Sequence, residues 1–458
     1  MGILGSGCYP LAKMLSERGY TVSGSDSGAH AEYYTDSAGI SIWRKRDTIP
    51  DGATLVIYSL AIDEGEAEVR DAKRRGITLL SRAQLLGALM SHSKTRISVS
   101  GSHGKSTTTA IIEHVLATAG MEYTAISGAS LHSGMAYADC GSDVFLAEAC
   151  EYKDSFLCLC PTHQIITSVE LDHTDYFASL EAIAHSFYLA ARRTRTVIIN
   201  EDDPIAAKIA ERLRREISEA KSYTPPGCNA KSDKIHTEEV ITYGRSPTAD
   251  YRIASVERTG EATAFCLGHQ TAEYHLVTTL IGDFNLYNIA AAVALADSLG
   301  VERKSIETAV TDFHGIERRL SRLGRIGDTE VYYDYAHHPS EIMAVIRALK
   351  ERYGSVSVIF RPHTYSRTAS LWDGFIEALS EASRVALVDV YPAREREIEG
   401  VSSLRLAECI VGAEYFNEPG EAVKFALAGE FGAVALLGAG EVAAIKDTLL
   451  NYEKASKS

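Results

Sequence analysis

The strongest constraint on the fold is a glycine-rich turn between an apolar strand and a helix, within residues 96–109. Alternating β-branched residues predict a buried strand over 96–100 that ends at Gly101, and an apolar helix is expected over 110–119. Backbone N–H groups of such a turn can surround a phosphate, and the helix N-terminus adds partial positive charge. The stretch therefore predicts a phosphate-binding loop.

The lysine and serine of this loop indicate nucleotide phosphates. Lys105 would reach the terminal phosphates, and the Ser106 hydroxyl would reach a magnesium ion. The spacing is G-x-x-G-K-S, two residues shorter than G-x-x-x-x-G-K-[ST] counted from its first glycine. The alternative is an ordinary glycine- and serine-rich loop with a solvated lysine. The strand before the loop and the helix after it favour phosphate binding.

Composition excludes several classes of protein. The net charge of −15, from 46 basic and 61 acidic residues, argues against broad binding to nucleic acid or membrane surfaces. No apolar run approaches the ~20 residues of a membrane span, so we expect no membrane insertion. Eight cysteines without a C-x-x-C pair predict reduced thiols in a cytoplasmic protein.

Strands and helices alternate along three segments, 1–93, 94–317 and 318–458, which predicts an α/β protein with parallel sheets. The first segment opens with a turn at Gly5 and Gly7, then a helix, then a strand that ends at Asp26. This is the layout of the first half of a dinucleotide-binding fold, although Pro10 stands where a third glycine is expected. Only Met1 precedes Gly2, so a start further upstream is an open alternative.

Two acidic residues lie where the predicted strand 143–148 meets its loop. Ligands of parallel sheets bind beyond the carboxyl ends of strands, so Glu148 is a candidate Mg²⁺ ligand, with Glu151 beside it. The alternative is a pair of solvated glutamates. Because Glu148 ends a strongly apolar run, the buried position is favoured.

Two further polar clusters each allow a ligand-binding role and a purely structural role. Asp172, His173 and Asp175 follow the strand 164–169 and indicate a second metal or a proton network, against a purely structural histidine. Asn285 and Asn288 share one face at a helix start. Their amides can cap that helix or read an adenine edge, and capping is favoured on chemistry alone.

The third segment places polar loops directly after predicted strands, at 333–341 and 361–368. Arg318 and Arg319 stand at its beginning. Arginines near one site in an acidic protein indicate an anionic substrate, whereas the alternative is a solvated charged face.

Together these motifs resemble the Mur ligase family, the ATP-dependent amide-forming enzymes of peptidoglycan synthesis. The residues that carry the resemblance are 101–109, 148–152 with Ser155 and Phe156, 171–177, Asn285 with Asn288, 334–339 and 362–368. Each motif is modest alone, but their order and spacing are specific, and the match runs nearly end to end.

The resemblance implies three domains and a two-step reaction. A Rossmann-like domain (1–93) binds the UDP sugar, a central P-loop ATPase-like domain with a parallel sheet (94–317) binds ATP, and a Rossmann-like domain (318–458) brings the amino acid. ATP phosphorylates the lactyl carboxylate of UDP-N-acetylmuramate, and the amine of L-alanine then attacks the acyl phosphate.

The resemblance also implies residue roles. The implied catalytic residues are Lys105, Glu148, His173, His338 and Arg367. The implied ATP-binding residues are Gly101, Ser102, His103, Gly104, Lys105, Ser106, Thr107, Asn285, Asn288, Arg319 and Asp334. The implied Mg²⁺ ligands are Ser106, Glu148 and His173, and the implied UDP-sugar site contains Gly5, Gly7 and Ser59.

Four rival interpretations stay open. The nearest is a recycling ligase that attaches an intact tripeptide to the same sugar nucleotide, and a folate polyglutamate ligase is more distant. The glycine turns at Gly5 and at 438–440 would suit a nicotinamide dehydrogenase, but Lys105 and Glu148 have no role there. A non-catalytic nucleotide-binding scaffold is the fourth. A monomer or a homodimer is expected.

Overall fold

The computed structural model describes the whole chain except residues 64, 132, 133, 142, 223–234, 270, 271, 394, 441, 457 and 458. The chain forms two compact units. One contains Met1–Glu170, Leu180–Thr278 and Tyr287–Phe313, and the other contains Leu171–Ser179, Thr279–Leu286 and His314–Ser458. The predicted α/β class is confirmed in both units.

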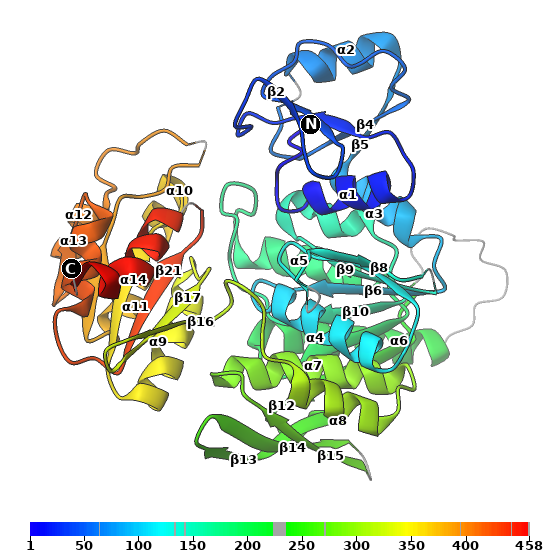
Figure 1. The fold of residues 1–458 in the computed structure, drawn as a ribbon. Helices are drawn as coiled ribbons and strands as arrows, with labels where there is room; N and C mark the ends of the chain where they lie inside the picture. The colour runs from blue at the N-terminus through cyan, green and yellow to red at the C-terminus, as the bar shows by residue number, and fades with distance from the viewer. Residues whose placement is uncertain are drawn as a thin grey trace. The chain divides into compact units, whose positions relative to one another are not determined.

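The first unit is built on a ten-stranded sheet (Figure 1). Its strands are β6 (Thr95–Ser100), β7 (Tyr123–Ile126), β8 (Tyr137–Asp139), β9 (Val144–Glu148), β10 (His163–Ile166), β11 (Thr196–Asn200), β12 (Glu239–Gly244), β13 (Tyr251–Thr259), β14 (Ala262–His269) and β15 (Ala272–Thr278). Their spatial order is β15-β14-β13-β12-β11-β10-β6-β9-β7-β8. In this spatial order, each neighbouring pair from β13 through β6 to β7 is parallel. The pairs β13–β14, β14–β15 and β7–β8 are antiparallel.

Strand β6 lies between β10 and β9, so three loops of this sheet meet at one edge. The segments that follow β6, β9 and β10 contain residues that the sequence analysis predicted as phosphate or metal ligands. Helices connect the strands: α4 (Lys105–Thr118), η1 (Tyr152–Cys158, a 3₁₀ helix), α5 (Leu180–Ala191), α6 (Pro204–Ser222), α7 (Asp283–Ser298) and α8 (Arg303–Asp312). The helix after the loop begins at Lys105 rather than at 110, because Gly104 adopts a left-handed conformation that starts it directly.

The N-terminal segment of this unit differs from the single parallel sheet that the sequence predicted. Its elements are α1 (Tyr9–Glu17), β1 (Ser23–Ser25), β2 (Tyr33–Thr35), β3 (Ser41–Trp43), β4 (Leu55–Tyr58), α2 (Ala67–Arg75), β5 (Thr78–Ser81) and α3 (Arg82–Met90). They form a three-stranded sheet, β1-β3-β2, and a parallel pair, β4-β5.

Residues 1–3 run between these two small sheets as irregular backbone. The Gly2 N–H donates to the Ser25 carbonyl at 2.8 Å, and the Met1 amino group donates to the Ile57 carbonyl at 2.8 Å. This short stretch therefore links the two sheets, but it is too short to form a strand of its own.

The second unit contains a six-stranded sheet in the order β16-β17-β21-β18-β19-β20. Its strands are β16 (Ser321–Ile326), β17 (Thr329–Asp334), β18 (Val356–Arg361), β19 (Arg384–Leu387), β20 (Ala413–Tyr415) and β21 (Ala433–Gly438), and all but β16 pair in parallel. Its helices are α9 (Pro339–Tyr353), α10 (Tyr365–Ser370), α11 (Trp372–Ser380), α12 (Ser403–Glu408), α13 (Pro419–Leu427) and α14 (Ala443–Ser456).

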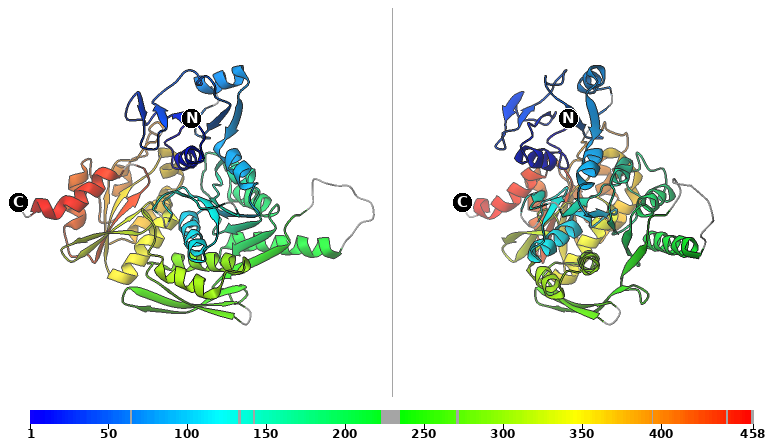
Figure 2. Two further views of the ribbon diagram at one scale, coloured as in Figure 1. Left: turned by 45° about the vertical axis from the view of Figure 1, so that its right-hand side comes forward. Right: turned by 90° about the vertical axis from the view of Figure 1, so that its right-hand side faces the viewer.

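Helices cover both faces of this sheet (Figures 1 and 2). One buried cluster joins the sheet to α9, α11 and α12, and a second joins its other face to α13 and α14. Strand residues that alternate between the two clusters, such as Val358 and Ile359, explain why β18 is apolar throughout. The carboxyl ends of β17 and β18 lead into the two polar loops of this unit.

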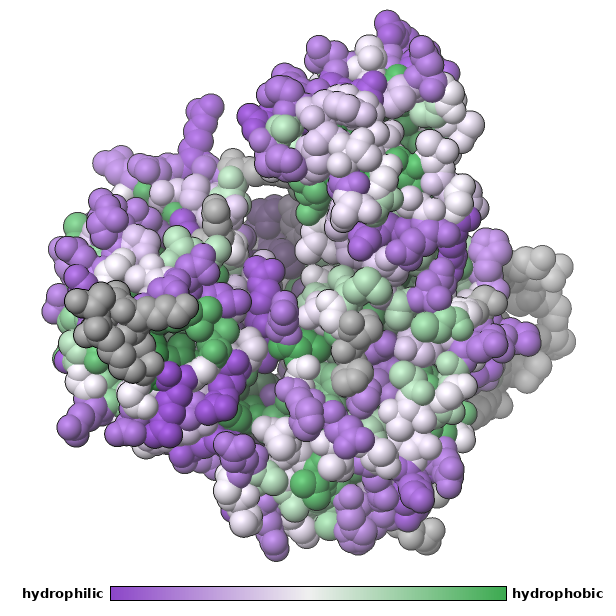
Figure 3. All heavy atoms as spheres, viewed as in Figure 1, coloured by the Kyte–Doolittle hydropathy of each residue, from purple (hydrophilic) through white to green (hydrophobic). Residues whose placement is uncertain are grey.

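Hydrophilic residues are spread over the face shown in Figure 3, and the hydrophobic areas there are small. In the described part of the chain, no helix combines the length and the apolar character needed to cross a membrane. The seven cysteines that the structure describes are free thiols, and Cys228 lies outside the described residues.

Candidate active site

Two glycines shape the loop between β6 and α4. Gly101 and Gly104 have φ values of +139° and +80°, which side chains rarely tolerate. A Cβ atom on Gly104 would lie 2.4 Å from Asn288 Oδ1, and one on Gly101 would lie 2.0 Å from Thr167 Oγ1. Both conformation and space therefore require glycine at these positions.

Lys105 is held at the mouth of α4. Its ammonium donates to the Ser102 carbonyl at 3.1 Å and to Glu151 Oε1 at 3.1 Å. Burial disfavours the charge of Lys105, but the buried carboxylate of Glu151, together with Cys150 and Glu148, outweighs that effect, so the lysine pKa is raised above its usual value. The loop therefore keeps a fixed cation, as a site for phosphate needs.

Glu148 ends β9 beside the same loop. Its carboxylate accepts hydrogen bonds from Ser106 Oγ at 3.2 Å, from Ser127 Oγ at 2.8 Å and from the Gly128 N–H at 2.9 Å. A carboxylate and a hydroxyl this close are the oxygen donors that Mg²⁺ prefers. Ser106 and Glu148 therefore fit a magnesium ion.

The chain after β10 braces the loop from its other side. The Ser102 N–H donates to the Ser168 carbonyl at 2.9 Å, and the His103 N–H donates to Ser168 Oγ at 3.1 Å. Ser102 Oγ accepts from the Glu170 N–H at 2.8 Å, and the His103 ring lies 3.4 Å from the Glu170 carboxylate. The Thr167 hydroxyl also donates to the His103 carbonyl.

The two asparagines of α7 have different partners. Asn288 Oδ1 accepts from Thr108 Oγ1 at 3.2 Å and adjoins Gly104, so this side chain contacts the phosphate loop and its helix. Asn285 Nδ2 donates to the Ile281 carbonyl at 2.9 Å, an interaction at the start of α7. Both side chains are buried.

In the second unit, Asp334 ends β17 and is almost fully buried. Its carboxylate accepts from the backbone N–H groups of Leu320 at 2.5 Å and Ala336 at 2.7 Å. Burial raises its pKa to about 6, against the lowering effect of the nearby Arg319. Arg319 itself lies over the ring of Tyr335, 5.5 Å from its centroid.

A buried ion pair joins Asp172 to Arg367 in the same unit. Arg367 Nη2 lies 3.0 Å from Asp172 Oδ1, and Arg367 Nη1 lies 3.2 Å from His363 Nδ1. Burial opposes ionisation of Asp172, but Arg367 more than compensates, and the carboxyl pKa is held well below its usual range. Burial lowers the pKa of His363 to about 3 and that of His337 to about 4, so both rings are neutral near pH 7.

His173 follows Asp172 with a positive φ of 54°, and its N–H donates to Asp172 Oδ1 at 2.7 Å. The loop is therefore shaped around the carboxylate. The sequence proposed a metal or a proton network for this cluster. The structure adds an arginine partner for Asp172.

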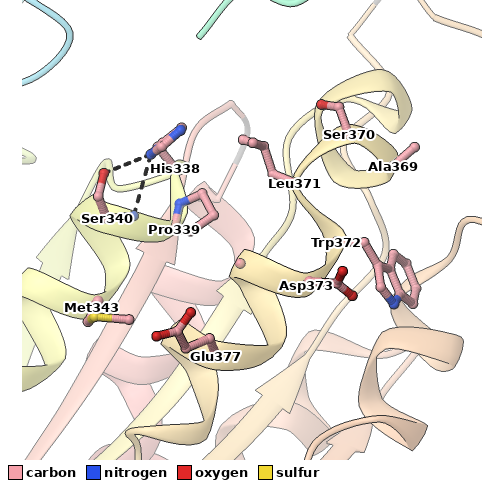
Figure 4. Close-up of a pocket in the computed structure, with 11 residues that line it drawn as sticks. His338, Pro339, Ser340, Met343, Ala369, Ser370, Leu371, Trp372, Asp373 and Glu377 are labelled. Carbon is pink, nitrogen blue, oxygen red and sulfur yellow. Dashed lines mark hydrogen bonds between the residues drawn. The ribbon is translucent and has the colours of Figure 1, made fainter. Parts of the chain in front are cut away.

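His338 is the N-cap residue of α9, where its Nδ1 accepts from the Ser340 N–H at 3.4 Å. It also borders a pocket of about 470 Å³ between α9 and the α10–α11 region (Figure 4). Met343 and the carboxylates of Asp373 and Glu377 also line this pocket.

The N-terminal glycine turn lies in the first unit. The carbonyl of Gly5 accepts from the N–H groups of Cys8 and Tyr9 at the start of α1. A Cβ atom on Gly7 would lie 3.1 Å from the Arg82 side chain. The Ser59 N–H donates to the Met1 carbonyl at 3.3 Å, so Ser59 adjoins the start of this turn.

The structure thus brings most predicted residues into two groups. The loop residues 101–107, Glu148 and Asn288 share the first unit, and His173, Asn285, Arg319, Asp334, His338 and Arg367 share the second. Sequence reasoning missed Ser127 as a partner of Glu148 and Thr167 as a partner of the loop. Both could have been suspected, because each immediately follows the carboxyl end of a buried strand, Ser127 after β7 and Thr167 after β10.

Comparison with family models covers nearly the whole chain. Residues 99–296 match the Mur ligase middle domain, residues 318–440 match the Mur ligase glutamate ligase domain, and residues 1–94 match the Mur ligase family catalytic domain.

Curated relatives and solved structures agree with these models. The chain is 35% identical to the UDP-N-acetylmuramate–L-alanine ligase of Lachnospira eligens, over 90% of this chain and 87% of the relative. It is 33% identical to the enzyme of the same name from Caldicellulosiruptor saccharolyticus, over 96% of this chain and 95% of the relative. The crystal structure of the UDP-N-acetylmuramate–alanine ligase of Thermotoga maritima shares the fold with a TM-score of 0.75 at 22% identity, covering 99% and 98% of the two chains.

Proposed function

This chain belongs to the Mur ligase family, and from that premise we propose that it joins the lactyl carboxylate of UDP-N-acetylmuramate to L-alanine in peptidoglycan precursor synthesis. ATP is the co-substrate of this amide ligase. The observation that supports the proposal most directly is the phosphate loop, where buried Lys105 stands beside Glu151 and Ser106 stands beside Glu148.

The first step is transfer of the terminal phosphoryl group of ATP to the lactyl carboxylate. A carboxylate is a poor acylating agent, and phosphorylation gives it a leaving group. Because two anions must meet, the Lys105 ammonium and the loop N–H groups of 101–107 neutralise phosphate charge. Ser106 and Glu148 would hold Mg²⁺, which supplies further charge neutralisation when bound, and His173 is the proposed helper of a second metal.

The second step is attack of the L-alanine amine on the acyl phosphate, with inorganic phosphate as the leaving group. We assign Arg367 and His338 to the incoming amino acid. Asp172 and His363 hold the Arg367 guanidinium in one orientation, and a fixed guanidinium suits a carboxylate.

The remaining roles are assigned by position. Asn285 and Asn288 meet adenine, Asp334 reaches the ribose, and Arg319 reaches the terminal phosphate. Gly5, Gly7 and Ser59 belong to the UDP-sugar site. The proposed domains are 1–93 for the UDP sugar, 94–317 for ATP and 318–458 for the amino acid.

We place the enzyme in the cytoplasm as a monomer or homodimer. The free thiols that the structure describes and the demand for ATP support this compartment. Light scattering of the purified protein distinguishes the two assembly states.

Attachment of the intact tripeptide L-Ala-γ-D-Glu-diaminopimelate is the second candidate. The pocket beside His338, at about 470 Å³, falls within the range that holds sizeable ligands, about 300–1,000 Å³. However, Asp373 and Glu377 line it, and their carboxylates would repel the several carboxylates of the tripeptide. L-alanine therefore remains the favoured acceptor.

The test is phosphate release from ATP and Mg²⁺ with UDP-N-acetylmuramate and either acceptor. Release that requires both the sugar nucleotide and L-alanine, and that disappears in Lys105→Ala, is expected. Lys208→Ala, an exposed lysine of α6, is the matched control and should keep full activity. Release with the tripeptide alone would identify the recycling ligase, and release with neither acceptor would contradict the proposal.

A further inference from the structure

Three metal-ligating side chains gather on the β14–β15 hairpin, away from the strand ends that carry the nucleotide loop. Cys266 of β14 and His275 of β15 are directly opposite in the antiparallel register. Glu273 lies two residues before His275 and therefore on the same face. The opposite face of the hairpin is apolar and buried, with Leu267 and Leu276 in the core.

The spacing of these groups suits tetrahedral coordination. Cys266 Sγ lies 3.5 Å from His275 Nδ1. A tetrahedral ion with a metal–sulfur bond of about 2.3 Å and a metal–nitrogen bond of about 2.0–2.1 Å requires a sulfur–nitrogen distance of about 3.5 Å. A carboxylate oxygen of Glu273 completes the group, with all three ligand atoms within 4.8 Å of one another.

We propose that Cys266, Glu273 and His275 form a binding site for a zinc-class divalent cation, with water in the fourth position. Sulfur and imidazole ligands select Zn²⁺ or Co²⁺ over Mg²⁺, which prefers oxygen. The site therefore does not compete for the magnesium that the ligase reaction uses.

The surroundings of the thiol add support. A β-bulge in β13 between Ala254 and Glu257, opposite Cys266, gives Ser255 a positive φ of 51°. The Ser255 hydroxyl hydrogen-bonds to Cys266, and Glu257 adds a nearby negative charge. A hydrogen bond to sulfur and extra negative charge are features that orient a ligand and favour a cation.

The bound ion would cross-link a sheet edge. Strand β15 ends the ten-stranded sheet, so β14 is its only partner among the strands that the structure describes. Ligands from both strands would fix the hairpin register at Cys266 and His275, and metal bound only by the folded protein would raise its melting temperature.

The test uses the full-length reduced protein with excess Mg²⁺. Titration with Co²⁺ should give a sulfur-to-cobalt charge-transfer band in the near ultraviolet, and Zn²⁺ should abolish it by displacement. Cys266→Ser should remove the band, and His275→Ala should weaken Co²⁺ binding by tenfold or more. Cys409→Ser, which changes an exposed cysteine of the other unit, should leave the band intact.

Two results would overturn the proposal. One is the lack of any band and of any Zn²⁺-dependent rise in melting temperature in the unsubstituted protein. The other is a band that survives in Cys266→Ser, since this would place the sulfur ligand elsewhere. Circular dichroism of each variant shows whether the fold is kept.

Discussion

Asp172 and Arg367, 195 residues apart in the chain, form an ion pair of 3.0 Å within one compact unit. Both side chains are largely buried, and the arginine also contacts His363. The Arg367 guanidinium, which we assign to binding of L-alanine, is therefore held by the carboxylate of Asp172, the residue before His173. Asp172 is a positioning residue in this scheme.

Asp172→Asn should raise KM for L-alanine at least tenfold while KM for ATP changes little. The asparagine leaves the Arg367 charge buried without its counter-ion, which should also cost about 3 kcal/mol of unfolding free energy. Steady-state kinetics and urea denaturation measure the two effects. Asp447→Asn, which changes an exposed aspartate of α14 in the same unit, is the matched control. Equal changes in both KM values would indicate a general structural role instead.

Glu151→Gln should move the alkaline limb of the pH–rate profile to lower pH. The Glu151 carboxylate opposes the effect of burial on Lys105 and raises the lysine pKa. Without that carboxylate, burial should lower the pKa, so the ammonium loses its proton sooner as pH rises. The profile of kcat/KM for ATP is the measurement. The alkaline limb of Glu151→Asp, which keeps the charge, should lie between those of the unsubstituted protein and Glu151→Gln. An unshifted limb in Glu151→Gln would disprove the electrostatic link between Glu151 and Lys105.

Gly104→Ala should weaken ATP binding tenfold or more. The backbone conformation costs about 1–2 kcal/mol for an L-residue, and the new methyl group would meet Asn288 Oδ1. Gly120→Ala is a close control, because Gly120 also has a positive φ, of 66°, but nothing within 4 Å of its Cβ position. Calorimetric ATP titration should separate the two variants. If both lose affinity equally, conformational strain alone is responsible.

Asp334 should make the protein less stable as pH rises from 4 to 6. Its folded pKa of about 6 lies above the ordinary value of 3.8, so in this window the folded state keeps a proton that the unfolded state has lost. Stability then falls with pH, by roughly 3 kcal/mol for this group alone. Asp334→Asn should remove that contribution.

His337 and His363 act in the opposite direction. Their lowered pKa values, about 4 and about 3, make stability rise with pH up to the ordinary histidine value of 6.5. The signature of Asp334 is therefore the difference between variant and unsubstituted protein in urea denaturation from pH 4 to 7. A pH-independent difference would show that Asp334 has an ordinary pKa.

Much of the fold could be predicted from the sequence because hydrophobic periodicity is a local signal. Strands β6 and β9 lie where apolar runs predicted them, within one residue. The strands missed were short or exposed, as with β8 and β20, or lay in the N-terminal segment. There the expected single sheet depended on pairing partners that periodicity does not specify.

Motifs in the sequence named the residues of the candidate site but not the contacts that hold them. Lys105, Ser106 and Glu148 were placed by motif, and the structure brings them together. The ion pair between Asp172 and Arg367 joins residues 195 positions apart, and no local pattern encodes such a contact. Asn288 shows the same limit, since its contact with Gly104 comes from packing of two helices far apart in sequence.

One short stretch of backbone, residues 168–172, contacts both the loop that we assign to ATP and the arginine that we assign to L-alanine. Ser168 and Glu170 hold the phosphate loop, and two residues later Asp172 holds Arg367. If binding of either ligand shifts this stretch, the contacts that position the residues for the other ligand change as well. Nucleotide and amino acid should then be linked ligands, each changing the dissociation constant of the other by the same factor.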